Sequence, residues 1–223
     1  MFDLISEYDS RILAAFWVTI KLTFFSAIGA LILGTIVAGM RVSPIPVARW
    51  VGTAYVSIFR NTPLTLIIVF CSLGLYSTLR WELAGDSIKD NNYWWAIIGL
   101  SVYTAAFVCE SLRSGINTVH IGQSEAGRSL GFGFAQNLRL IVLPQAFRAV
   151  IAPLGSVLIA LTKNSTIASV IGVGEAAFLM SEMNENEAAV LAIGAIFALG
   201  FVVLTLPTGL FFGWLAKRFE VVR

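Results

Sequence analysis

Charge is the scarcest property of this 223-residue chain. Only 13% of its residues are Asp, Glu, Lys or Arg, whereas a soluble domain typically has about 25%. Hydrophobic residues make up 57%, and the mean hydropathy is +0.83. So little charge cannot cover a water-facing surface, which excludes a soluble or disordered chain and leaves no room for an extramembrane enzyme domain. The composition predicts an all-α integral membrane protein, because about 20 apolar residues cross a bilayer as a helix.

Residues that build catalytic or metal sites are also rare. The chain has one histidine and two cysteines, Cys71 and Cys109, which lie in apolar stretches and fit a packing role. No G-x-x-x-x-G-K-[S/T] phosphate loop occurs, and no basic run suggests a nucleic-acid partner. We therefore predict that the chain is not an enzyme, that it holds no cofactor or metal, and that any ATP is bound by another protein.

Apolar runs with few charges predict five membrane-spanning helices in one domain that covers residues 1–223. The predicted spans are about 12–40, 48–79, 91–112, 145–174 and 188–216. Pro207 predicts a bend in the fifth, because proline lacks the backbone donor of a regular helix. A longer connection, about 117–143, joins the third and fourth spans.

Lysine and arginine indicate the orientation, because they are enriched in cytoplasmic loops. With the N-terminus outside, the cytoplasmic segments contain Arg41, Arg49, Arg113, Arg128, Arg139, Arg148, Lys217, Arg218 and Arg223. The outer segments then contain only Arg11, Arg80 and Lys89, together with most of the acids, Glu175 and Glu182 among them. We expect an external N-terminus and a cytoplasmic C-terminus.

The connection at 117–143 is longer than the two to eight residues that usually join antiparallel helices. Its sequence predicts a short helix at about 121–130, a turn at 131–133, and a second short helix that leads into Leu143 and Pro144. Glycine suits the tight turn, and proline suits the first turn of a helix. This helix-turn-helix indicates a docking surface for a partner protein.

Several residues of this loop match a known motif in type and spacing. They are Glu125, Ala126 and Gly127, then Gly131 after three residues, and Ile141, Leu143 and Pro144 after nine more. The pattern resembles the EAA loop of ABC-importer permeases, with Gly127 in place of the family's second alanine, a change that predicts a slightly looser helix. The resemblance implies that Glu125 and Ala126 contact an ATPase subunit, that Gly131 forms the turn, and that Leu143 and Pro144 anchor the loop in the membrane.

Other segments are similar, in the same order, to the polar-amino-acid branch of that family: FRNTPL at 59–64, ESLRSGI at 110–116, LPQAFR at 143–148 and KNST at 163–166. The chain also resembles actinobacterial glutamate-uptake permeases. The resemblance implies a type I permease subunit of the bacterial plasma membrane that forms half of a translocation path. Its implied partners are two copies of an ATP-binding subunit that binds ATP and Mg, a second permease subunit, identical or similar, and an extracellular amino-acid-binding protein.

Polar side chains interrupt two of the apolar runs, and we interpret them as lining the substrate path. They are Arg60, Asn61, Thr62 and Pro63 in the second span, and Lys163, Asn164, Ser165 and Thr166 in the fourth. Lys163 lies near the middle of its span, where a cation costs about 2.5–3.5 kcal/mol. Polar contacts between helices are the alternative explanation. Pro63 interrupts its helix, which would free backbone carbonyls to line a cavity.

The excess of positive charge along this path favours an anionic or zwitterionic substrate. Glutamate is the first choice, and aspartate or glutamine come next. For Glu110, an ion pair with Arg113 three residues later is as consistent as a substrate role. The alternative function is a gradient-driven secondary transporter or channel, which the EAA-like loop and the absence of internal repeats disfavour.

Overall fold

A computed structural model describes residues 2–187 and 189–219 of the chain. The described elements are helical apart from a single bridge between Ala84 and Asp86. In chain order the helices are α1 (Phe2–Val42), α2 (Pro46–Asn61), α3 (Leu64–Val69), the π-helix η1 (Phe70–Thr78), α4 (Ile88–Asn117), α5 (Ile121–Ser129), α6 (Phe134–Asn137), the π-turn η2 (Leu138–Val142), α7 (Leu143–Asn164), the 3₁₀-helix η3 (Ser165–Ile171), α8 (Ala176–Asn186) and α9 (Val190–Phe219).

Among the described residues, four continuous helices are long and apolar enough to cross a membrane: Ser6–Val42, Ile88–Asn117, Phe134–Ile171 and Val190–Phe219. A fifth crossing requires α2 and the α3–η1 segment together, and these are bent by 102° with respect to each other. The second predicted span, about 48–79, is therefore not one regular helix. The bend lies at Pro63, and Thr62 before it is extended (φ −99°, ψ 131°), as expected of a residue that precedes proline.

The helix that contains Lys163 is longer and less regular than the predicted span at 145–174. It runs from Phe134 to Ile171, and its α-helical part ends at Asn164, where the 3₁₀-helix η3 begins. Lys163 thus lies in the last turn of α7 and not in the middle of an α-helix. The hydroxyls of Ser165 and Thr166 donate to carbonyls three residues back, at 2.8 and 2.7 Å. Such bonds offer the backbone an alternative to the regular helix ladder.

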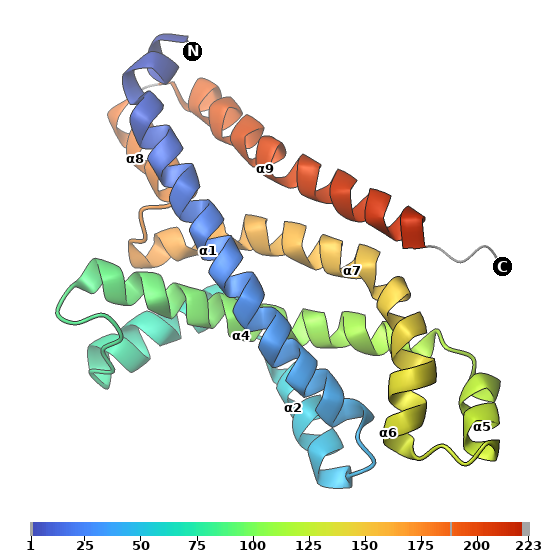
Figure 1. The fold of residues 1–223 in the computed structure, drawn as a ribbon. Coiled ribbons are helices and arrows are strands. Elements are labelled where there is room, and N and C mark those ends of the chain that lie inside the picture. The colour runs from blue at the N-terminus through green and yellow to red at the C-terminus, as the bar shows by residue number, and fades with distance from the viewer. Residues whose placement is uncertain (1, 188, 220–223) are drawn as a thin grey trace.

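Helices α1 and α4 cross closely at the centre of the bundle (Figure 1). Small residues permit this approach: a Cβ on Gly34 would lie 2.9 Å from the carbonyl oxygen of Ala105, and one on Gly29 would lie 2.5 Å from Oγ of Ser101. Glycine at helix crossings is typical of membrane proteins, where packing brings helices together without a hydrophobic effect between them. Helix α4 is therefore the central element of the bundle, around which the other helices pack.

Helix α8 packs beside the N-terminal half of α1, and the loop helices α5 and α6 lie at the other end of the bundle (Figure 1). Glu175 caps α8: its carboxylate accepts from the N–H groups of Ala177 and Phe178, at 2.9 and 3.0 Å, and lies 3.5 Å from the Thr19 hydroxyl. The sequence places Glu175 among the acids of the outer loops, yet the residue is fully buried. Helices start with unpaired N–H groups, and this carboxylate pairs with two of them at the start of α8. Because it also contacts Thr19, it joins α8 to α1.

Candidate functional site

The two interrupted segments meet in the folded chain. The α3 helix, just after the bend at Pro63, contacts η3, just after the end of α7. Leu64 and Leu161 belong to one buried cluster, together with Ile68 and Leu100. The polar residues that break the second and fourth spans, about 100 positions apart in the sequence, are therefore placed in one region of the bundle.

A cavity of about 350 Å³ lies between α4 and α7 in this region. Its lining consists of Tyr103, Thr104, Phe107, Ser156, Val157, Ala160, Leu161 and Asn164. Of the predicted path residues, Asn164 belongs to this lining. The hydroxyl of Thr104 is buried, with the residue 4% exposed, and has no hydrogen-bond partner within the described residues. A buried hydroxyl without a partner is costly, so it is available to a polar ligand.

Sequence reasoning missed the α4 side of this cavity. Tyr103, Thr104 and Phe107 lie in the charge-free run of the third span and read there as ordinary apolar or weakly polar residues. Their spacing is the one available signal, because residues three and four apart share a face of a helix. That signal marks a common face, but it does not tell whether the face lines a cavity or the core.

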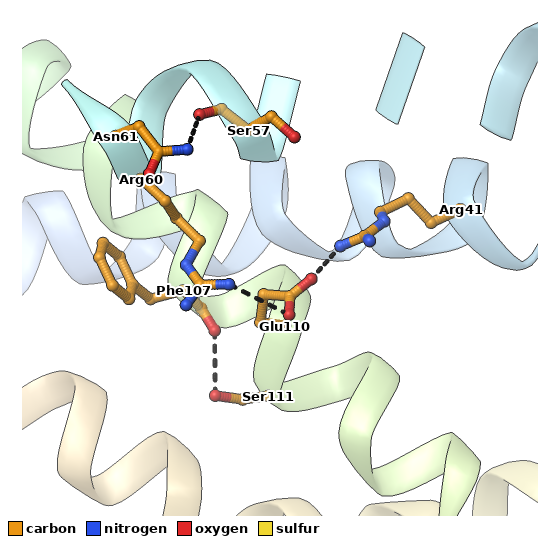
Figure 2. A network of polar contacts seen from close by, with 7 residues as sticks. All are labelled: Arg41, Ser57, Arg60, Asn61, Phe107, Glu110 and Ser111. Carbon is orange, nitrogen blue, oxygen red and sulfur yellow. Dashed lines mark hydrogen bonds and ion pairs between the residues drawn. The ribbon is translucent and has the colours of Figure 1, made fainter. Parts of the chain in front are cut away.

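Arg60 is held by a polar network at the end of α2 (Figure 2). Its Nη1 lies 3.3 Å from Oε2 of Glu110 on α4, and its guanidinium lies 5.7 Å from the ring centre of Phe107. The other carboxylate oxygen of Glu110 pairs with Arg41, from the last turn of α1. The ion pair with Arg113 considered from the sequence is not formed in the described structure. Both partners of Glu110 come instead from neighbouring helices.

Four of the predicted path residues hydrogen-bond to the backbone of their own segment. The Asn61 amide donates to the carbonyl of Ser57 at 2.7 Å (Figure 2), and the Thr62 hydroxyl donates to that of Ile58 at 2.8 Å. The hydroxyls of Ser165 and Thr166 do the same, as described above. These side chains therefore stabilise the helix ends beside the bend and the 3₁₀ transition. Arg60, exposed Lys163 and Asn164 remain as the polar groups of the predicted set with functional atoms available to a solute.

The predicted docking loop forms two short helices around a glycine turn. Glu125 and Ala126 are exposed on α5, and Gly131 has φ +87°, a left-handed conformation that favours glycine. Leu143 and Pro144 lie in the first turn of α7, which continues directly from α6 through the π-turn η2. The second helix of the loop is thus the beginning of the long helix that ends beside the cavity.

Gly127 is the contact point between the two loop helices. A Cβ at this position would lie 2.5 Å from Cδ1 of Ile141 and 2.9 Å from Oδ1 of Asn137. Asn137 is itself held in place, because its Nδ2 donates to the carbonyl and the hydroxyl of Ser124, both at 2.8 Å. Glycine at the third motif position therefore has a packing reason that the motif alone does not predict.

Comparison with known proteins gives the family. Residues 14–221 match the family model described as "binding-protein-dependent transport system inner membrane component". The chain belongs to this family of ABC-importer permeases. The glutamate transport system permease protein GluC of Corynebacterium efficiens is 58% identical to this permease over 99% of both chains, and GluC of Corynebacterium glutamicum is 57% identical over the same share. Membership of the family sets aside the alternative of a gradient-driven transporter or channel.

Solved structures agree with this assignment. A crystal structure of an amino acid ABC transporter with histidines contains a chain that matches the permease with a TM-score of 0.86 and 26% identity, over 98% of both chains. The MetNI methionine ABC transporter has the same fold, with a TM-score of 0.79 at 18% identity, over 96% of the permease and 99% of the other chain.

The polar groups of this region are suited to binding a carboxylate. The described residues include no convergent group of three or more His, Cys, Asp or Glu side chains. The polar groups at and beside the cavity are a guanidinium, an ammonium, a carboxamide and hydroxyls. Guanidinium and ammonium groups form charge-assisted hydrogen bonds with carboxylates, which are about twice as strong as neutral ones.

Proposed function

We propose that this permease carries glutamate across the bacterial plasma membrane, with aspartate or glutamine as the next candidates, and forms half of the path of an ATP-driven importer. The observation that carries the proposal is 58% identity, over the whole chain, to a permease named for glutamate transport. The charge of the site supports it. Arg60 is exposed and contacts Phe107 of the cavity lining, and Lys163 is exposed and precedes the lining residue Asn164 in the sequence. The carboxylate of Glu110 is already paired with Arg41.

In this proposal the solute passes between the α2–α3 bend and the end of α7. Arg60 and Lys163 attract its carboxylates, while Asn164 and Thr104 offer hydrogen bonds inside the cavity. The remaining residues of the predicted set, Asn61, Thr62, Pro63, Ser165 and Thr166, keep the two helix breaks in shape. The breaks thereby hold the charged groups at the edge of the path.

Energy comes from outside the chain. Two copies of a separate ATP-binding subunit bind ATP and Mg, and each contacts one coupling loop through Glu125, Ala126 and the surface around Gly127 and Gly131. Leu143 and Pro144 carry the loop into the membrane. Support for this coupling comes from the helical segment Phe134–Ile171, which connects the loop to the cavity without an intervening loop and contains the π-turn η2 and Pro153. A displacement of the loop is passed along this segment to Asn164 through its packed turns.

The assembly that follows has two permease subunits, identical or similar, and an extracellular amino-acid-binding protein on the outer side. The excess of Lys and Arg in the segments assigned to the cytoplasm supports an external N-terminus and a cytoplasmic C-terminus. In this orientation α8 and the N-terminal half of α1 lie on the outer side, and α5 and α6 lie on the ATPase side.

Uptake of radiolabelled glutamate, glutamine and arginine by the reconstituted complex tests the substrate. We expect glutamate uptake to depend on ATP and to be competed by aspartate or glutamine more strongly than by arginine. Lys163→Ala should weaken the apparent affinity for glutamate. Thr104→Val should do the same without lowering thermal stability, because the lost hydroxyl has no partner in the described structure. Unaltered affinity in both variants, with intact ATPase coupling, would exclude this path.

A further inference from the structure

The polar network around Glu110 has an unbalanced charge. Two guanidinium groups, those of Arg41 and Arg60, share the single carboxylate of Glu110. The network therefore carries one net positive charge at the ends of α1 and α2. In a membrane protein such a charge is costly unless an anion or water compensates it. The exposed guanidinium of Arg60 is the part of this network that a water molecule or an anionic ligand can reach.

The two contacts of Glu110 are unequal. The Arg41 side chain is 10% exposed and pairs closely with one oxygen. The Arg60 side chain is 46% exposed and reaches the other oxygen at 3.3 Å through a single nitrogen. A guanidinium has five N–H donors, so this contact uses a small part of what Arg60 offers. Arg60 is thus the weakly held member of the network.

Release of Arg60 leaves Glu110 paired. Removing one partner of a buried ion pair is expensive when it strands a charge, but Arg41 remains on the carboxylate. The guanidinium of Arg60 also keeps its contact with the ring of Phe107, which lines the cavity between α4 and α7. Arg60 can therefore turn toward an anion in or near that cavity without breaking the rest of the network.

We propose that Arg60 exchanges between Glu110 and a carboxylate of the passing substrate, and that Arg41 is the positioning residue that makes this exchange possible. The inference rests on the proposed function, because it requires a substrate with a carboxylate. Arg60 stands three residues before Pro63, so the exchange takes place at the α2–α3 bend. Occupancy of the cavity is thereby linked to the helix break that separates the two halves of this segment.

Two substitutions should have opposite effects on the Kd for glutamate. Glu110→Gln removes the anion that competes for Arg60, so the Kd should fall by about 1.5- to 5-fold, the range of an exposed ion pair. Arg41→Gln leaves Glu110 with Arg60 as its remaining partner, so the Kd should rise by a similar factor. The double variant should follow Glu110→Gln, because the competing carboxylate is gone. A purely structural network would instead weaken binding in both single variants.

Binding of radiolabelled glutamate to the purified permease–ATPase complex, without the extracellular binding protein, gives these constants. Arg49→Gln is the matched control: Arg49 is exposed in the first turn of α2 and is not one of the ion-pair partners of Glu110 in the described structure, so its loss should leave the Kd unchanged. If Arg41→Gln does not assemble, Arg41→Lys should shift the Kd in the same direction by less, since lysine keeps the charge without the planar fork.

The exchange is overturned if Glu110→Gln and Arg41→Gln shift the Kd in the same direction, or if the double variant follows Arg41→Gln. It is also overturned if the wild-type complex transports glutamate but shows no binding to the permease. A wild-type complex that transports no glutamate contradicts the proposed function itself, so the two failures are distinguishable.

Discussion

Restoring the family's alanine at position 127 should damage the proposed coupling loop. The added Cβ would lie 2.5 Å from Cδ1 of Ile141 and 2.9 Å from Oδ1 of Asn137, both closer than normal contact. Overpacking of this kind costs about 1–3 kcal/mol. Alanine is better than glycine in a helix by about 1 kcal/mol, which offsets part of the cost. The net loss in the stability of the loop is therefore small. The free-energy cost of the clash has to be measured separately from the gain in helix propensity.

A double-mutant cycle makes that separation. Ile141→Val removes the Cδ1 atom, so it relieves the closest contact of Gly127→Ala while the helix propensity cancels from the cycle. We expect a favourable coupling of about 1–2 kcal/mol between the two substitutions, which is less than the full clash because Asn137 stays in place. Glutamate transported per ATP hydrolysed should fall in Gly127→Ala and recover in the double variant.

Amide hydrogen exchange of residues 121–130 in the purified complex reports the local stability. The net loss of about 0–2 kcal/mol in Gly127→Ala corresponds to exchange up to roughly 30-fold faster than in the wild type, because 1.4 kcal/mol is a factor of ten. A coupling near zero between Gly127→Ala and Ile141→Val would refute the packing explanation for this glycine.

Two further substitutions test the framework around the site. Gly34→Ala should lower the free energy of unfolding by about 1–3 kcal/mol, because the new Cβ would lie too close to the fixed carbonyl of Ala105. Gly39→Ala, in the same helix with nothing within 4 Å of the new atom, is the control and should not lower it. Burial raises the pKa of Glu175 to about 7. The folded state therefore holds this proton more tightly than the unfolded state. As a result, the stability of the protein falls as the pH rises from about 4.5 to 7. Glu175→Gln should flatten this part of the profile, which melting temperatures measured between pH 5 and 8 will show. If variant and wild type differ by the same amount at every pH in this range, Glu175 is not the source of the pH dependence.

Composition and charge-free runs predict membrane spans in the regions where the structure has long apolar helices, but they do not predict where those helices end. The third span is predicted at about 91–112, whereas α4 extends over Ile88–Asn117. The additional turns are polar: Ser87 caps the helix by accepting from the N–H of Asp90, at 3.3 Å. A charge-free apolar run marks the part of a helix that lies in lipid. Helical turns that continue into water are polar, so this pattern does not reveal them.

The pairing of charges could not be predicted, because it depends on how helices pack. Glu110 meets Arg41 and Arg60, which are 69 and 50 positions away, and not its near neighbour Arg113. Glu175 is a comparable case, since its position after an apolar run suggests an exposed loop while the fold buries it against Thr19. Local spacing predicts contacts along one helix, and these contacts lie between helices.

The bend at Pro63 also affects how the protein enters the membrane. Helix α2 has 16 residues, or about 24 Å at 1.5 Å per residue, which is shorter than a hydrocarbon core of about 30 Å. Leu64–Thr78 is no longer, so neither half spans the bilayer alone. Both halves pack against α4, which the ribosome delivers later. We therefore expect that α2 and the α3–η1 segment reach their final depth in the membrane only after α4 has been synthesised. Substitutions on the face of α4 that contacts them should then reduce the insertion of these two earlier helical segments.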